Sequence, residues 1–262
     1  MADAAAEENG WIRELIGGGI EIAGGAVGGA LGFLAGGPAG AAALGAGGSA
    51  VAAVLKHVGT EMCERYLGPR EKVRVGGVLA LAAAEIDAGM KAGVALRTDG
   101  FFDCKLGERS GAEEVAEDVL LKSQREPEER KLPYMAHLLA AVSFDTNVSP
   151  EFAHQLTKIA EQLTYRQLCI LSLAANKHRF VLHASNYLDA SQFPIELRQV
   201  LYECFDLYNR GLLSFGGTVA LSVPHVAPGS MEVQGLGADM FNLMKLAFIS
   251  DAELVPLASV LK

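Results

Sequence analysis

Cysteine is scarce in this sequence, and the cysteines that it has are widely separated. There are four, and no two of them form a CxxC pair: Cys63, Cys104, Cys169 and Cys204. Disulfide frameworks and zinc sites need closely paired cysteines or cysteine–histidine clusters. The six histidines are not spaced as metal ligands either. We therefore expect no metal site, no cofactor and a protein of the reducing cytoplasm.

The short motifs of the common catalytic loops are also missing. The P-loop pattern GxxxxGK[ST] does not occur, and Gly47-Gly48-Ser49 is followed by Ala50, so GxSxG is incomplete. A Cys/His nucleophile pair stays open, because its partners would meet only in the fold. Scattered buried cysteines are the commoner arrangement, and we expect no enzymatic activity.

Positive charge is in short supply. The 262 residues include 22 Lys and Arg against 31 Asp and Glu, which gives a net charge of −9. Binding to nucleic acid needs clustered Lys and Arg that neutralise phosphates. The composition therefore argues against nucleic acid as the main partner.

What the sequence does have is a long uncharged stretch, Ile22–Leu55. Glycines recur in it at a spacing of four: Gly24, Gly28, Gly32, Gly36 and Gly40. On a helix this spacing places them on one face, where the backbone of a second helix can come into contact. Pro38 divides the stretch. The pattern predicts a glycine-rich hairpin of two helices, over 22–37 and 39–55.

Three interpretations of this hairpin stay open. It associates with or inserts into a membrane, it packs within a soluble assembly, or it is a flexible linker. Glycine costs about 1 kcal/mol relative to alanine inside a helix, so the stretch is a poor helix in water, whereas unpaired amides in lipid cost far more. Phe33 and Leu34 are among its few large apolar residues, and Trp11 fits an interfacial anchor as well as a helix packed on the body. We expect conditional association with the inner membrane.

The rest of the chain reads as helices in two further domains. We expect an N-terminal segment over 1–67, a helical domain over 68–163 and a third domain over 164–262. Within the second, an Ala-rich helix from about 70 to 93 suits close packing, and Ser110 opens another helix with the box S-x-x-E. We expect residues 1–10 to be disordered and the charge run at 126–131 to be solvated.

The third domain has the element order of a winged helix. Helices are expected from Thr164 and from Pro194, and Gly211 is expected to end the second of them. Short strands at Leu212–Phe215 and Met231–Val233 and a further helix from Ala238 should follow. Winged helices most often bind DNA, but the expected recognition helix carries three acids against one arginine. We favour contact with a protein partner through this domain.

Parts of the sequence resemble a known family. The segments YMAHLLAAVSFD (Tyr134–Asp145) and SPEFAHQLTKIAEQLTYRQLCIL (Ser149–Leu171), with NRGLLS and MEVQGLG between Asn209 and Gly237, are similar to bacterial abortive-infection alpha-type proteins. The resemblance covers roughly the C-terminal half. It implies a bacterial defence role in which an infected cell is sacrificed or stalled. It brings no catalytic residue, and the glycine-rich hairpin is not a feature carried over from it.

Together these observations predict a mainly α protein with a glycine-rich hairpin, a helical bundle and a winged-helix-like domain. The function that we expect is that of a membrane-acting anti-phage effector whose hairpin packs and oligomerises in or on a membrane. The alternative is a soluble helical scaffold or sensor that homo-oligomerises through the hairpin, and a DNA-binding regulator comes third. The expected partners are a second copy of the chain, membrane lipid and a protein bound by the winged-helix-like domain.

Overall fold

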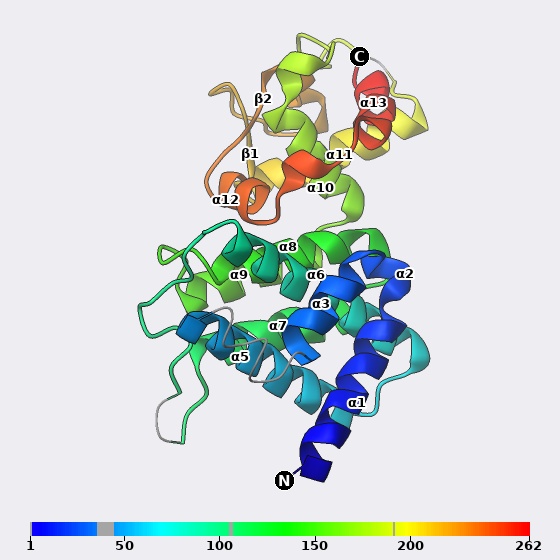
Figure 1. Ribbon diagram of the computed structural model, residues 1–262. Coiled ribbons are helices and arrows are strands. Elements are labelled where there is room, and N and C mark those ends of the chain that lie inside the picture. Colours follow the sequence, from blue (N-terminus) through cyan, green and yellow to red (C-terminus); the bar gives the residue numbers. More distant parts are fainter. Residues whose placement is uncertain (1, 36–44, 105–106, 191) are drawn as a thin grey trace. The chain divides into compact units, whose positions relative to one another are not determined.

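A computed structural model describes residues 2–35, 45–104, 107–190 and 192–262 of the chain (Figure 1). The structure is mainly helical, as expected, with a small two-stranded antiparallel sheet. It divides into two compact units, Met1–Gln162 (unit 1) and Leu163–Lys262 (unit 2). The predicted N-terminal segment, 1–67, lies in unit 1 together with the helices that follow it.

Unit 1 is a helical bundle around α6. Its α-helices are α1 (Ala2–Gly18), α2 (Ile20–Ala23), α3 (Ala26–Ala35), α5 (Gly45–Glu64), α6 (Pro69–Lys91), α7 (Gly111–Arg125), α8 (Leu132–Val142) and α9 (Pro150–Gln162). Helix α6 contacts α1, α2, α3, α5, α7 and α8, and its middle part is buried and rich in Ala and Gly. Small residues let these neighbours approach closely, so α6, rather than the glycine-rich stretch, is the centre of this unit.

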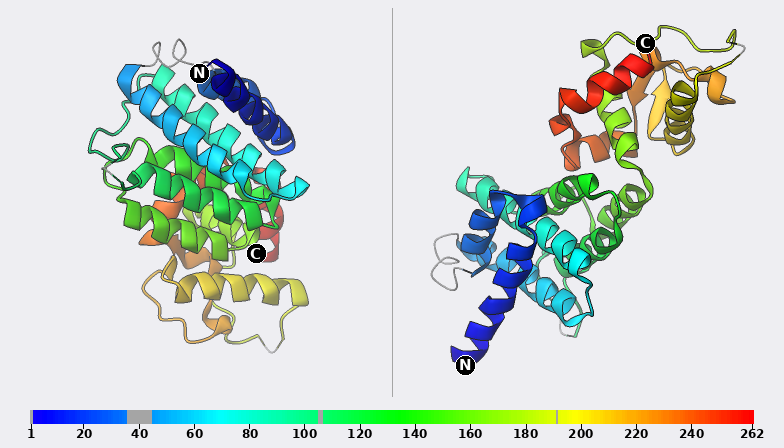
Figure 2. Two further views of the ribbon diagram at one scale, coloured as in Figure 1. Left: turned by 90° about the horizontal axis from the view of Figure 1, so that it is seen from below. Right: turned by 90° about the vertical axis from the view of Figure 1, so that its right-hand side faces the viewer.

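The closest helix contact is between the backbones of α1 and α6. A Cβ added to Gly76 would lie 2.0 Å from the carbonyl oxygen of Leu15, and one added to Gly19 would lie 2.2 Å from the amide nitrogen of Gly77. Figure 2 shows α1 at the edge of unit 1, with its first turns extending past the helices on which it packs. Glycine-mediated packing is therefore present, but at glycines outside the predicted row of five.

The N-terminal region differs from the prediction in three ways. The backbone is helical from Ala2, where we expected disorder. The first half of the hairpin is broken, because Gly24 has φ +53°, a left-handed conformation that glycine adopts without the Cβ clash. The break separates α2 from α3 and lets both lie on α6. The described part of the second half is one helix, which starts at Gly45 and continues past the predicted end at Leu55 as far as Glu64.

Local helix signals were predicted correctly, but one charge run was not. Ser110 and Glu113 form both bonds of the capping box at the start of α7. The run at 126–131, expected in solvent, instead contains a buried ion pair: Lys131 is 1% exposed, and its Nζ contacts Glu126, which is 7% exposed. The Lys131 ammonium also donates to the Glu161 carbonyl, so this corner ties the end of α7 to α9.

Unit 2 contains α10 (Tyr165–Ala175), α11 (Ile195–Asn209), α12 (Leu236–Leu243) and α13 (Asp251–Val260). The two predicted strands are confirmed as β1 (Leu213–Phe215) and β2 (Met231–Val233), which pair antiparallel with Ser214 opposite Glu232. Helix α11 ends as predicted, since Gly211 follows it with φ +72°. The apolar side chains of β1 are buried in the core of this unit.

Candidate functional site

The predicted glycine row places a bare helix surface on the outside of unit 1. Four exposed glycines, one in the turn before α3 and three within it, are called here the glycine face: Gly25, Gly28, Gly29 and Gly32. A Cβ would meet no atom within 4 Å at Gly25, Gly28 or Gly32, and at Gly29 it would only touch the Ala84 side chain at 3.7 Å. The packing of the chain itself therefore does not require glycine at these positions.

The other predicted site residues lie elsewhere. Phe33 and Leu34 are 5% and 1% exposed, on the side of α3 that packs on α6. Trp11 is half-buried against α5, where a Cβ on Gly59 would lie 3.2 Å from its ring. Gly24 is exposed in the turn before α3, and the predicted positions Gly36 and Gly40, with Pro38, lie outside the described residues.

The structure thus brings Gly28 and Gly32 together on one exposed face and places Phe33 and Leu34 in the core. Along the described parts of the chain, we find no helix that has both the length and the apolar character to span a bilayer.

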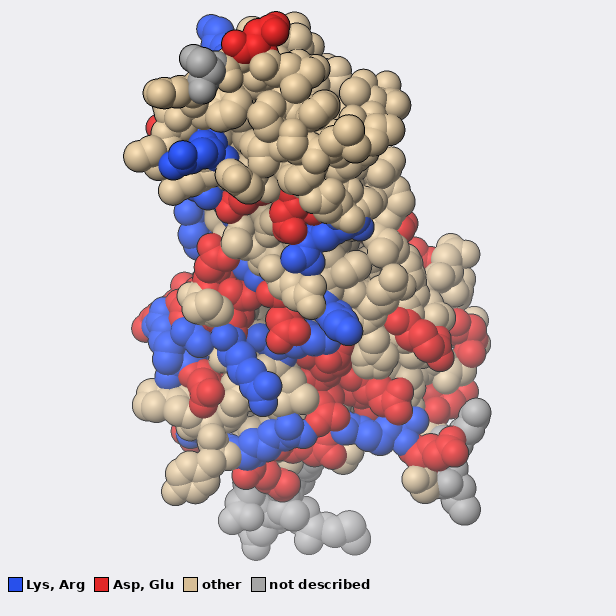
Figure 3. Space-filling model, turned by 180° about the vertical axis from the view of Figure 1, so that it is seen from behind, with Lys and Arg blue, Asp and Glu red and all other residues tan. Residues whose placement is uncertain are grey.

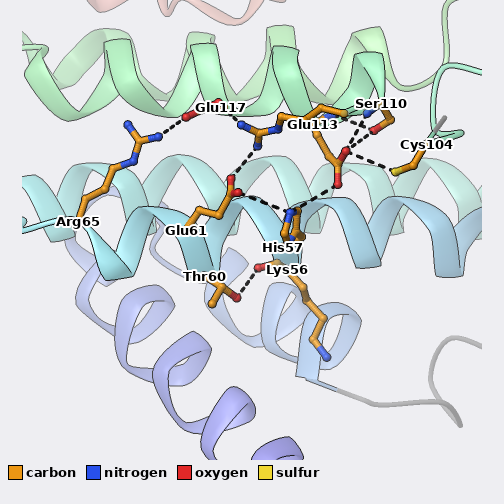
Figure 4. A network of polar contacts seen from close by, with 10 residues as sticks. Lys56, His57, Thr60, Glu61, Arg65, Cys104, Ser110, Glu113 and Glu117 are labelled. Atoms are coloured by element: carbon orange, nitrogen blue, oxygen red, sulfur yellow. Dashed lines mark hydrogen bonds and ion pairs between the residues drawn. The ribbon is translucent and has the colours of Figure 1, made fainter. Parts of the chain in front are cut away.

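A polar network that sequence reasoning missed joins α5 to α7 (Figure 4). Arg109, just before α7, donates to Glu61 of α5 at 2.7 Å and also pairs with Glu117 of α7. His57 Nε2 lies 3.5 Å from a Glu61 oxygen and 3.8 Å from a Glu113 oxygen. Arg65 adds a second pair to Glu117. Only the i, i+4 spacing of His57 and Glu61 was visible in the sequence, because the pairs between helices depend on which helices are neighbours.

Glu113 is at the centre of this network. Its carboxylate accepts hydrogen bonds from the backbone N–H of Ser110 at 2.8 Å, from the Ser110 hydroxyl at 3.1 Å and from the Cys104 thiol at 3.5 Å. Burial opposes its ionisation, but the hydrogen bonds from Ser110 and Cys104 outweigh burial and lower the pKa of Glu113. The carboxylate therefore stays charged and caps the start of α7, while Arg109 joins that helix to α5.

The network does not form the Cys/His pair that the sequence left open. The Cys104 thiol donates to Glu113, and His57 approaches the other oxygen of that carboxylate, so the carboxylate lies between thiol and imidazole. Burial raises the pKa of the Cys63 and Cys204 thiols, which disfavours the reactive thiolate. Within the described ranges no three His, Cys, Asp or Glu side chains are placed to hold a metal ion. The arrangement serves as an electrostatic staple between two helices.

Unit 2 has a different surface. Eight of the eleven large hydrophobic residues found exposed in the described chain belong to it, among them Val181, Tyr202 and Leu221. Figure 3 shows one face of the molecule, on which charged side chains gather over unit 1 while the surface of unit 2 is mostly uncharged. The segment 211–231, which contains β1 and the loop after it, has no charged residue at all. Exposed apolar area of this kind is typical of protein contact surfaces.

No protein-family model, curated protein or solved structure matches this chain. The resemblance to abortive-infection alpha-type proteins therefore rests on the quoted motifs alone and stays a prediction.

Proposed function

We propose that unit 1 is a self-association module in which the glycine face of α3 docks on the glycine face of a second copy. One observation supports this proposal above the others. Helix α3 buries one side on α6, and its other side exposes Gly28, Gly29 and Gly32. Among the described residues, a Cβ at these positions would meet only the Ala84 side chain, at 3.7 Å from Gly29.

The energetic cost of these glycines gives the physical reason. Each exposed glycine inside a helix costs about 1 kcal/mol relative to alanine, so the three within α3 cost about 3 kcal/mol. Alanine would fit at Gly25, Gly28 and Gly32 without a clash. Backbone-to-backbone contact with another helix, through van der Waals packing and Cα–H···O contacts, needs the missing side chains and offsets the cost.

For unit 2 we propose a winged-helix organisation that contacts protein. The order α10, α11, β1, loop, β2, α12 supports it. The loop after β1 has no Lys or Arg to meet phosphate and exposes Val219 and Leu221 instead. Both features favour a protein partner over DNA.

The membrane-acting defence role stays a prediction, and it requires a change of conformation in unit 1. Phe33 and Leu34 would have to leave α6 before they could face lipid, since both are buried in the present arrangement. Flotation of the purified protein with anionic liposomes tests this step, and recovery of all protein below the lipid layer would contradict it.

The self-association proposal is tested with a matched pair of double variants. Gly28→Leu with Gly32→Leu adds two side chains to the glycine face, at positions where a Cβ meets no atom of the described residues within 4 Å. Gly10→Leu with Gly17→Leu makes the same change at exposed glycines of α1. In sedimentation velocity over a concentration series, we expect the wild type and the α1 control to form the same oligomer and the α3 variant to remain monomeric.

Two results would contradict the proposal. One is a wild type that stays monomeric at the highest concentration, and the other is an α3 variant that assembles as the wild type does. Circular dichroism melting of both variants checks that each remains folded.

A further inference from the structure

Unit 2 has two adjacent hollows that share Phe180 and Val181 in their walls. Their volumes are about 520 and 210 Å³. Leu182 adds an apolar wall to the larger hollow, and Val255 of α13 adds one to the smaller. The two hollows flank the same pair of residues and are together called here the 180–181 groove.

The groove is a firm surface built on backbone contacts. Phe180 has an extended backbone, with φ −126° and ψ 150°. The N–H of His183 donates to the carbonyl of Leu261 at 2.8 Å, and the N–H of Gly229 donates to the carbonyl of His183 at 2.8 Å. A Cβ on Gly229 would lie 2.9 Å from that same carbonyl, so glycine is needed for this approach. The extended segment is thus held between two neighbouring parts of unit 2.

Its apolar walls are open to solvent. Val181 is 71% exposed and Val255 is 50% exposed. An enclosed cavity that surrounds most of a small ligand has a different form, since such cavities cover 70–90% of the ligand surface as a rule. An open apolar surface instead suits a peptide segment of another protein.

The charged residues around the groove favour a partner segment that carries negative charge. Its lining includes Lys177, His178, Arg179 and Lys262 and no acid, in a chain whose net charge is −9. Lys177 pairs with Glu232 at 3.0 Å, and Arg179 pairs with Asp251 at 2.7 Å, with both acids more than half exposed. Surface pairs of this kind contribute about 0–1 kcal/mol, so carboxylates of a ligand can replace them at little cost.

We propose that the 180–181 groove docks an extended peptide segment of a partner protein, in which apolar residues alternate with Asp or Glu. In an extended chain, every second side chain points the same way, at intervals of about 7 Å. Apolar side chains can then enter the two hollows while the carboxylates between them face the basic rim. This site belongs to unit 2 and does not depend on self-association through α3.

The test uses the full-length protein and three labelled peptides. The probe is a fluorescein-labelled ten-residue peptide of alternating Leu and Glu, and its controls alternate Leu with Lys and Ser with Glu. Fluorescence anisotropy measures binding to wild type, to Val181→Asp and Arg179→Gln in the groove, and to Val94→Asp, an exposed valine of unit 1. We expect wild type and Val94→Asp to bind the Leu–Glu peptide equally and each groove variant to bind at least tenfold more weakly.

Three results would overturn the proposal. These are equal binding of the Leu–Lys peptide, full binding by Val181→Asp, and binding of a small amphiphile such as laurate in place of the peptide. Arg179→Gln removes the ion pair with Asp251, so melting curves confirm its fold, while Val181→Asp changes only an exposed side chain.

Discussion

At the scale of single residues, glycine has two opposite roles in unit 1. Gly76 is buried and lets the Leu15 carbonyl approach, whereas Gly28 is exposed and a Cβ there would meet no described atom within 4 Å. Both glycines lie inside α-helices, Gly76 in α6 and Gly28 in α3. The space around each residue therefore decides whether a side chain is forbidden or merely absent.

The first prediction compares alanine at these two positions. Gly76→Ala forces a Cβ against the backbone of Leu15 and should destabilise the protein by about 1–3 kcal/mol, despite the better helix propensity of alanine. Gly28→Ala meets no atom within 4 Å and should stabilise the subunit by up to about 1 kcal/mol. Urea unfolding measures both changes. A Gly76→Ala variant as stable as wild type would show that α1 does not make this contact.

The second prediction concerns the pH dependence due to Glu113. Its pKa is lowered in the folded state, so its contribution is present above its ordinary pKa of 4.5 and is lost as pH falls through the lower folded value. Glu113→Gln should therefore cost about 1 kcal/mol at pH 7 and progressively less below pH 4.5. Urea midpoints from pH 7 to pH 3 measure the difference.

Glu114→Gln is the control for this experiment, since it makes the same change at an exposed neighbour in the same helix turn. It should alter stability by less than about 0.5 kcal/mol at every pH. A pH-independent cost of Glu113→Gln would mean that its charge is not what stabilises the start of α7.

At the scale of elements, charged groups join the helices of unit 1 in addition to its apolar core. The staple of His57, Glu61, Arg109 and Glu113 joins α5 to α7 near the surface. Lys131 and Glu126 do the same in the interior, after the end of α7. The two arrangements differ in burial. Removing one partner should therefore lower the free energy of unfolding more for the buried pair than for the exposed network.

The third prediction follows from the buried pair. Lys131→Met leaves the Glu126 carboxylate buried without its cation and should cost about 3–5 kcal/mol. Adding Glu126→Gln should recover much of this loss, because no unpaired charge then remains. Lys72→Met is the control: Lys72 pairs with Glu14 at 3.7 Å, both side chains are exposed, and its loss should cost at most about 1 kcal/mol. Failure of the double variant to recover stability would show that packing of the lysine stem matters more than charge.

At the scale of the whole molecule, charge is divided unevenly between the units. Unit 1 has 15 Lys and Arg against 23 Asp and Glu, and unit 2 has 7 against 8, so nearly all of the net charge of −9 belongs to unit 1. Copies that meet through unit 1 therefore repel each other, whereas the basic rim of the 180–181 groove attracts an acidic peptide.

The fourth prediction is that salt acts in opposite directions on the two proposed interactions. The screening length falls from about 10 Å at 0.1 M salt to about 3 Å at 1 M. Raising salt from 50 mM to 500 mM should strengthen self-association through α3 several-fold, since repulsion is screened, and should weaken binding of the Leu–Glu peptide. Sedimentation and anisotropy series measure the two trends. If both interactions weakened with salt, the proposed glycine-face contact would be wrong.

The sequence by itself determined the elements whose signals are local. The Ser110–Glu113 box, Gly211 after α11 and the two short strands were placed correctly, because caps and turns depend on a few neighbouring residues. The mainly helical class follows from the same kind of evidence. These features need no knowledge of what the rest of the chain does.

Only the tertiary structure decided which surfaces meet. A glycine row has no side chains to show which way it faces, so the sequence could not tell that Gly28 and Gly32 point outward while Gly19 and Gly76 make the backbone contact. Lys131 was expected in solvent because its sequence neighbours are charged, but burial depends on the helices packed around it. The 180–181 groove likewise arises where Phe180 and Val255, far apart in the chain, come to lie side by side.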